Sequence, residues 1–235
     1  MQSVAVIGAN GYVGKEIYAS LLRSQKYSVI AVTRENYNEA KQKNFDFIIN
    51  SAMPAARFWA KQNPKKDFVE TVQKTADLTY DWKYKKFVQI STVSARCQLD
   101  TVYGRHKATA EKICGFDKNL IFRLGPMYNQ ELKKGVLIDI LQNKKVFVAG
   151  ESRYCFSPVS FVADWIVSHL DYSGIIEVGG QNAITLKDVA EHLGKKIEFE
   201  GVIDHQEIEN PAPEFPEARE VLNFLDNYLD AFKQN

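Results

Sequence analysis

The sequence predicts an α/β fold, a doubly wound parallel sheet with helices on both faces. Short β-branched apolar runs alternate with stretches of helical spacing, and the first run ends at a glycine-rich turn that opens a helix. The runs are apolar throughout and not at every second residue, which is typical of strands buried on both faces. Because parallel neighbours need crossover connections, the intervening helices must cover both faces of the sheet.

The first half of the chain supplies the strand–helix alternation. The predicted strands cover residues 3–7, 29–32, 45–49, 87–90 and 120–124. A helix over residues 12–24 is predicted from Val13, Ile17 and Leu21, which recur at helical spacing. Only about a dozen residues separate the second strand from the third, which leaves room for one short helix and excludes a further strand–helix pair.

The second half is predicted to form a smaller α/β part. Its helices are expected at residues 131–141, 159–170, 186–193 and 217–232, and its strands at residues 146–148 and 175–178. The prolines within residues 210–216 mark a linker before the last helix. We therefore place a boundary after residue 125, with residues 1–125 as the core, to which strand 175–178 returns, and residues 126–235 as the second part.

Composition excludes several classes of protein. The 235 residues include 30 Lys+Arg and 29 Asp+Glu, a net charge of +1 that supplies no broad field for nucleic acid or an anionic membrane. The three cysteines have no spacing typical of a disulfide framework or a zinc site, so we predict no metal. No apolar run is long enough for a signal peptide or a membrane span. We expect a cytoplasmic protein that binds neither nucleic acid nor membrane.

The glycine-rich turn reads Gly8-Ala-Asn-Gly11-Tyr-Val-Gly14 and lies between the first strand and the first helix. Glycine lets the backbone approach a diphosphate closely, and a helix N-terminus offers that anion unpaired N–H groups and a positive dipole end. The alternative is a turn that only joins strand to helix. Its position at the first strand–helix junction favours dinucleotide binding. The expected contacts are Gly8, Asn10, Gly11, Tyr12, Val13 and Gly14.

Tyr103 and Lys107 form a second motif, because a spacing of four places both side chains on one face of a predicted helix. A cationic lysine favours the phenolate, which makes a phenol with an ordinary pKa of about 10 usable for acid/base chemistry near neutral pH. On a solvated helix the same spacing carries no function, but here it follows a buried strand that ends in hydroxyl residues. His106, inside the motif, is expected to face away from the site.

At these motifs the sequence resembles the extended or atypical short-chain dehydrogenase/reductase family of NAD-dependent epimerase/dehydratase-like proteins. Further segments match the family in order over roughly residues 3–195. The resemblance implies a Rossmann fold in which residues 1–125 bind the dinucleotide. It implies that residues 126–235 form a reduced substrate-binding subdomain with the C-terminal helix.

The resemblance also implies roles for single residues. Tyr103 would exchange a proton with the substrate, and Lys107 would lower the pKa of Tyr103 and bind the nicotinamide ribose. Thr92 would hydrogen-bond the substrate oxygen, with Ser94 in reserve. The family's dehydratases carry Asp-Glu after this threonine, so Val93 and Ser94 make dehydration by that route unexpected. The resemblance adds cofactor contacts at Ser51 and Ala52 and substrate contacts at Ser94, Arg123, Met127, Tyr128 and Arg153.

The end of the second strand bears on the choice of cofactor. An acidic residue there would hold the ribose hydroxyls of NAD, but the run ends in Thr33 and Arg34. Arg34 can pair with a 2′-phosphate, and Thr33 can donate a hydrogen bond to it. The alternative is that Glu35 takes the ribose. We therefore predict NADP, with NAD as the alternative.

The sequence as a whole predicts an NAD(P)-dependent oxidoreductase that transfers hydride to or from a carbonyl or hydroxyl substrate, with Tyr103 as acid/base. One alternative is a nucleotide-sugar epimerase with tightly held NAD, and another is a non-catalytic dinucleotide-sensing regulator. The expected partner is a small molecule, with sugar nucleotides among the candidates. The expected oligomeric state is a monomer or a homodimer.

Overall fold

A computed structural model describes residues 1–115 and 117–233, and in the last helix the side chains are described through residue 228. Contacts group the chain into two units. Unit 1 comprises Met1–Leu124 and Ser160–Ile176, and unit 2 comprises Gly125–Val159 and Glu177–Asn235. Residues 160–176 thus go with unit 1, although they follow the boundary that we placed after residue 125.

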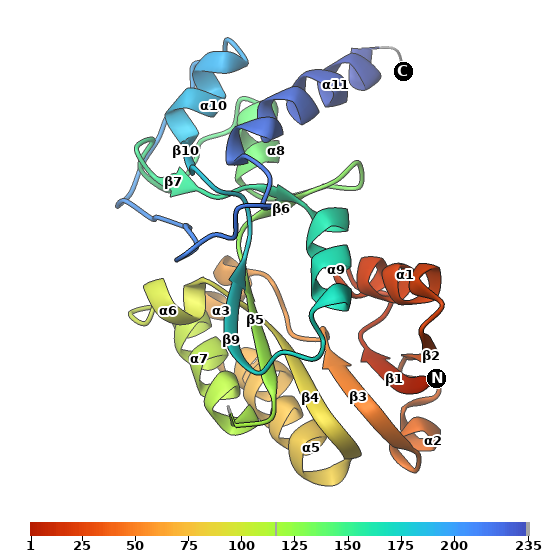
Figure 1. Ribbon diagram of the computed structural model, residues 1–235. Helices are drawn as coiled ribbons and strands as arrows, with labels where there is room; N and C mark the ends of the chain where they lie inside the picture. The colour runs from red at the N-terminus through yellow and green to blue at the C-terminus, as the bar shows by residue number, and fades with distance from the viewer. Residues whose placement is uncertain (116, 234–235) are drawn as a thin grey trace. The chain divides into compact units, whose positions relative to one another are not determined.

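Unit 1 is built on a six-stranded sheet with the strand order β2-β1-β3-β4-β5-β9 (Figure 1). Its strands are β1 (Gln2–Ile7), β2 (Tyr27–Val32), β3 (Asn44–Asn50), β4 (Lys83–Thr92), β5 (Leu120–Leu124) and β9 (Gly174–Val178). The registers β1–β2, β1–β3, β3–β4 and β4–β5 are all parallel. The predicted doubly wound α/β fold is confirmed, and the strand predicted at residues 175–178 joins the sheet beside β5.

Strand β2 lies at the edge of this sheet. The chain between β2 and β3 holds one short helix, α2 (Tyr37–Lys41), as the spacing predicts. Asn36 closes the turn after β2, because its Oδ1 accepts a hydrogen bond from Thr33 N at 2.8 Å and its Nδ2 donates to Ala31 O at 2.9 Å. The end of β2, where we place the cofactor's ribose, therefore lies at the edge of the sheet.

Helices α1 (Gly14–Ser24) and α9 (Val159–Ser168) lie together on one face of the sheet (Figure 1). Ser20 Oγ on α1 donates to Asp164 Oδ1 on α9 at 2.6 Å. Trp165 of α9 packs edge-on against Phe122 of β5, with ring centres 6.0 Å apart. The other face is covered by α3 (Arg57–Gln62), α4 (Pro64–Phe68), the π-helical turn η1 (Val69–Gln73), α5 (Lys74–Asp81) and α7 (Val102–Cys114). The short helix α6 (Ser94–Cys97) follows β4.

Unit 2 has two small sheets. Strands β6 (Met127–Tyr128) and β8 (Ser157–Pro158) pair in parallel, and β7 (Arg153–Tyr154) pairs antiparallel with β10 (Ile184–Thr185). Its helices are α8 (Val136–Leu141), α10 (Leu186–His192), the 3₁₀ turn η2 (Ala218–Glu220) and α11 (Val221–Lys233). Leu137, Leu186 and Leu225 meet in its apolar core. Unit 2 is therefore a small α/β unit in this structure.

Several predicted elements differ from the structure. The helix predicted from residue 131 begins at Val136, because Gly135 has φ +100°, a backbone conformation that interrupts a right-handed helix. The strand predicted at residues 146–148 is not formed, and Val146 makes only an isolated bridge with Phe199. Strand β4 begins at Lys83 and not at residue 87. The N-terminal end of the predicted last helix is the 3₁₀ turn η2.

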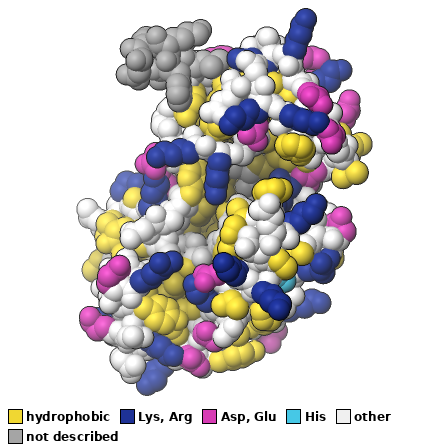
Figure 2. Space-filling model, turned by 180° about the vertical axis from the view of Figure 1, so that it is seen from behind, with side chains coloured by type: hydrophobic (Ala, Val, Ile, Leu, Met, Phe, Trp, Pro, Cys, Tyr) yellow, Lys and Arg dark blue, Asp and Glu magenta, His cyan; other side chains and the backbone are white. Residues whose placement is uncertain are grey.

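The surface mixes charged and apolar side chains, as Figure 2 shows for one face of the molecule. Among the described residues, no helix is both long enough and apolar enough to cross a membrane.

Candidate active site

The glycine-rich turn brings β1, α1 and the end of β3 into close contact. Gly11 N donates to Gly8 O at 2.9 Å, and Gly8 has φ +79°. A Cβ added at Gly14 would lie 2.1 Å from Gly8 O, and one added at Gly8 would lie 2.8 Å from Ala52 Cα. Both distances are far below van der Waals contact, so these two positions require glycine for the local backbone alone.

Gly11 differs from the other two glycines. A Cβ added there would meet only Gly8 O, at 3.2 Å. Asn10 and Gly11 are exposed, Tyr12 and Val13 are half-buried, and Val13 makes no side-chain capping bond to the start of α1. An uncapped helix N-terminus behind an open glycine is a cradle suited to a diphosphate. The residues present therefore fit the predicted dinucleotide.

Ser51 and Ala52 hold the turn in place. Ser51 N and Ser51 Oγ both donate to Ile7 O, at 3.0 and 2.8 Å. Ala52 backs onto Gly8. These contacts explain why small residues follow β3, and the direct contact with the cofactor ribose stays a prediction.

Thr33, Arg34 and Glu35 lie together after the edge strand β2. Arg34 and Glu35 are exposed. A hydrogen bond from the Thr33 hydroxyl is the largest cause that lowers the pKa of Glu35, and the charge of Arg34 lowers that pKa further. The end of β2 therefore presents an arginine beside an ionised glutamate.

The three predicted catalytic residues come together. Thr101 Oγ1 caps α7 by accepting a hydrogen bond from Gly104 N at 3.0 Å, so the helix begins just before Tyr103. Lys107 Nζ lies over the Tyr103 ring, 5.2 Å from its centre. The side chain of Thr92, at the end of β4, lies close enough to the Tyr103 phenol to lower its pKa.

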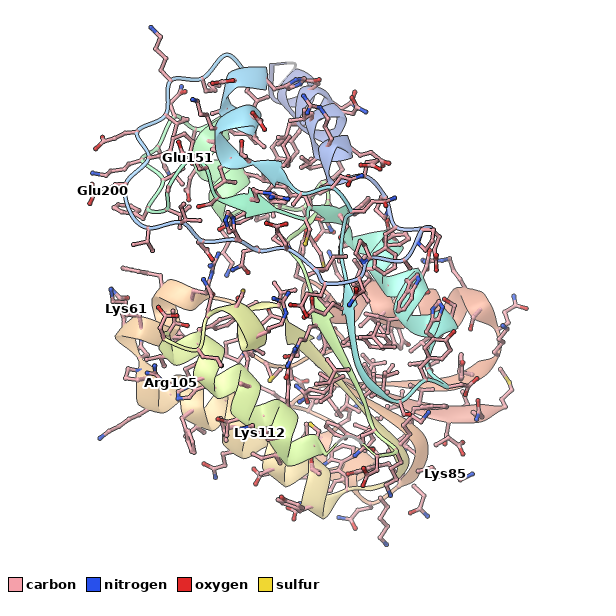
Figure 3. All side chains as sticks on the ribbon, turned by 60° about the vertical axis from the view of Figure 1, so that its left-hand side comes forward. Lys61, Lys85, Arg105, Lys112, Glu151 and Glu200 are labelled. Carbon is pink, nitrogen blue, oxygen red and sulfur yellow. The ribbon has the colours of Figure 1, made fainter. Side chains whose placement is uncertain are left out.

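Helix α7 is amphipathic around this pair. Tyr103, Lys107, Ala110, Glu111 and Cys114 are buried and recur at helical spacing. Arg105 and Lys112 of the same helix are exposed and point away from the sheet (Figure 3). Tyr103 and Lys107 are therefore both buried, because their spacing places them on the face of α7 that packs against the rest of unit 1.

Burial dominates the protonation of both groups. It raises the pKa of Tyr103 to about 12, with Asp67 adding to the rise and Arg57 and Thr92 opposing it. It lowers the pKa of Lys107 to about 7, with Asp67 and Glu111 opposing the fall. The predicted lowering of the Tyr103 pKa is therefore wrong for this structure, because desolvation of the phenolate outweighs the groups that favour it. At neutral pH Tyr103 is a neutral phenol, which suits a proton donor.

Two further side chains, the buried Asp67 and the half-buried His106, extend this site beyond the predicted residues. Asp67 of α4 is fully buried, and its Oδ2 lies 2.6 Å from His106 Nδ1. His106 therefore faces α4, whereas we expected it to face away from the site. Sequence analysis missed Asp67, because an acidic residue in the first turn of a short helix is typical of ordinary capping.

Arg123 lies in a buried network of unit 1. Its Nε and Nη2 donate to Glu111 at 3.0 and 2.7 Å, and Ser91 Oγ donates to Glu111 Oε1 at 2.6 Å. This network ties α7 to β4 and β5. Ser94 is buried and its N donates to Thr92 Oγ1 at 3.3 Å, which helps to orient that hydroxyl. The substrate roles of Arg123 and Ser94 stay predictions.

The remaining predicted substrate residues lie in unit 2. Tyr128 is part of the apolar core and packs on Phe224, with ring centres 4.7 Å apart. Met127 is half-buried beside it on β6, and Arg153 pairs with Glu207 at 3.0 Å. Their substrate roles also stay predictions.

Comparison with solved structures identifies the fold. RMD from Pseudomonas aeruginosa, complexed with NADPH, has 15% identity and a TM-score of 0.76, with 98% of this chain and 100% of that chain covered. This chain has a Rossmann-like α/β fold, which it shares with RMD. dTDP-4-dehydrorhamnose reductase from Yersinia enterocolitica has 13% identity and a TM-score of 0.72, with 97% and 100% covered.

UDP-glucose 4-epimerase from Thermotoga maritima, solved with UDP-glucose, is a further neighbour with this fold. It has 14% identity and a TM-score of 0.68, and 99% of each chain is covered. No protein-family model and no curated protein matches the sequence. The Rossmann fold implied by the sequence resemblance is thus confirmed, and at these identities the likeness concerns the fold.

Proposed function

We propose that this protein is an NAD(P)-dependent oxidoreductase of the short-chain dehydrogenase/reductase type. One observation carries the proposal: Thr92, Tyr103 and Lys107 converge beside the carboxyl end of β4, and the glycine-rich turn follows the carboxyl end of the parallel strand β1. In open α/β sheets, ligands bind outside the carboxyl ends of the strands. The same edge would hold the dinucleotide and the reacting carbon.

The residues have distinct roles in the proposed reaction. Bound NADPH supplies a hydride to the substrate's carbonyl carbon. Thr92 holds the carbonyl oxygen, and Tyr103 gives that oxygen its phenolic proton as charge develops on it. The ammonium form of Lys107 then stabilises the tyrosinate across the short distance between the two side chains. In the oxidative direction Tyr103 acts as the base, because its tyrosinate form accepts the proton of the substrate hydroxyl.

Arg34 supports NADPH as the preferred cofactor, and RMD, which shares the fold, was solved with NADPH. Arg34→Ala is expected to weaken NADPH binding about tenfold or more, because a charge-assisted pair with the 2′-phosphate is lost, and to leave NADH binding nearly unchanged. Titration of both cofactors by fluorescence measures this. Arg23→Ala, at an exposed arginine on α1, is the control. A wild-type preference for NADH above tenfold would contradict the proposal.

The glycines of the turn are expected to separate folding from binding. Gly14→Ala should destabilise the fold by several kcal/mol, because its Cβ would overlap Gly8 O and the overlap involves backbone. Gly11→Ala should fold with little loss of stability and bind NADPH at least tenfold more weakly, since the added methyl group faces the proposed diphosphate position. Urea unfolding and NADPH titration of both variants test this. Equal effects of the two substitutions on stability would contradict it.

The substrate is proposed to be a small carbonyl compound or a sugar nucleotide, the ligand class of the Thermotoga maritima epimerase. A screen of both classes for NADPH consumption is the direct test of the proposed activity. A nucleotide-sugar epimerase would instead purify with bound NAD and need none added. A protein that binds NADPH but turns over no compound in either class would favour the sensing regulator.

A further inference from the structure

We propose that Asp67, held by His106, is a positioning residue that keeps Lys107 in its ammonium form and Tyr103 in its phenol form. The role in catalysis rests on the proposed function. The charge relationship between the three side chains is a property of the folded chain and can be tested without a substrate.

The first observation is the position of Asp67. It lies on α4, which packs against α7, and its side chain is fully buried. One carboxylate oxygen is 2.6 Å from His106 Nδ1. The other, Oδ1, is buried and has no hydrogen-bond partner among the described residues. An ionised carboxylate left half-satisfied in the interior is costly unless nearby positive charge compensates for it.

The second observation is the set of charges around the pair. Arg57 on α3 acts on Tyr103, whereas Asp67 acts on both Tyr103 and Lys107. Glu111, one turn after Lys107 on α7, also acts on Lys107. However, Glu111 is engaged by two nitrogens of Arg123 and by the Ser91 hydroxyl, so much of its charge is neutralised inside that network.

Of the two acidic side chains that act on Lys107, Asp67 is consequently the one whose negative charge is less neutralised by other partners. His106 fixes the position of the carboxylate, and Phe68 packs edge-on against the imidazole with ring centres 5.6 Å apart. His106 directly precedes Lys107 in the helix and lies one turn after Tyr103. One short stretch of α7 therefore carries the proton donor Tyr103, the cation Lys107 and the imidazole of His106, which holds the Asp67 carboxylate.

The consequence for the reaction follows from electrostatics. A negative charge nearby disfavours loss of a proton from both the ammonium and the phenol. Carbonyl reduction needs both protons present, one on Tyr103 to be donated and one on Lys107 to stabilise the tyrosinate that remains. Asp67 thus favours the reductive direction at neutral pH.

NMR of the protein labelled with ¹³C at the lysine ε-carbon tests the inference. The Lys107 signal is assigned by its absence from Lys107→Met, and its titration is followed in the wild type, Asp67→Asn and Asp77→Asn. Asp77 is an exposed acidic residue of α5 and serves as the matched control. Asp67→Asn should increase the acid dissociation constant of Lys107 about tenfold, moving its titration to lower pH, while Asp77→Asn leaves it in place.

An unchanged Lys107 titration in folded Asp67→Asn would overturn the inference, whatever the effect on stability. If the asparagine variant does not fold, Asp67→Ser removes the same charge with a smaller side chain and is interpreted in the same way. Once a turned-over carbonyl substrate is available, the basic limb of kcat/KM should move to lower pH in Asp67→Asn. Failure of turnover alone contradicts the proposed function and leaves the NMR result standing.

Discussion

Tyr103→Phe is expected to lower kcat for carbonyl reduction by about 10²–10⁴-fold, the usual contribution of a positioned general acid. The phenol is buried beside Thr92 and is neutral at pH 7, because burial raises its pKa to about 12. Removal of the hydroxyl deletes the transferred proton and keeps the ring that lies under Lys107. NADPH affinity should change little, so the loss appears in kcat. Steady-state kinetics with a substrate found by screening, together with an NADPH titration, measures both.

Tyr80→Phe is the matched control for this substitution, because Tyr80 is 73% exposed on α5 and removal of its hydroxyl should leave kcat unchanged. If Tyr103→Phe retains the wild-type rate on every responsive carbonyl substrate, the acid/base assignment is wrong.

Lys107→Met is expected to make the protein more stable at neutral pH and to abolish its turnover. Burial lowers the pKa of Lys107 from 10.5 to about 7. Between these two pH values the unfolded chain binds a proton that the folded chain does not, so wild-type stability rises with pH through this window. The cost of burying the ammonium is fully present at and below about pH 7. Methionine removes this cost, so the gain should be on the order of 4 kcal/mol at pH 7 and should vanish towards pH 10.5.

Urea unfolding of the wild type and Lys107→Met across pH 6 to about 10 measures this difference. Lys112→Met is the matched control, since Lys112 is exposed on the same helix (Figure 3), and its effect on the free energy of unfolding should be small and nearly independent of pH. A gain for Lys107→Met that does not decline with pH would contradict the origin assigned to it. A lysine retained in the interior at a cost in stability is what a functional role predicts.

The local sequence pattern was sufficient to predict many of the elements of unit 1. The strand predicted at residues 120–124 has those bounds in the structure, and the glycine-rich turn lies between β1 and α1 as predicted. The Tyr103–Lys107 pair was also predictable, because a spacing of four on a helix fixes which side chains share a face. Short elements outside the sheet were less predictable. Helix α8 begins only after Gly135, whose positive φ interrupts the predicted helix. The backbone conformation of a single glycine depends on its surroundings, so the sequence did not predict this start.

Periodicity and spacing predicted the doubly wound sheet, its glycine-rich turn and the Tyr103–Lys107 pair, because they act within one element or between adjacent ones. The assignment of Thr92 needed the family resemblance as well. The folded structure sets the protonation of Tyr103 and Lys107, the burial of Asp67 against His106 and the pairing of Arg123 with Glu111. These properties depend on how far a side chain is removed from water and on charges supplied by elements distant in the chain. Local spacing predicts neither the burial of a side chain nor the charges that distant elements bring to it. The Tyr-x-x-x-Lys motif therefore predicted a lowered pKa for Tyr103, whereas burial raises that pKa.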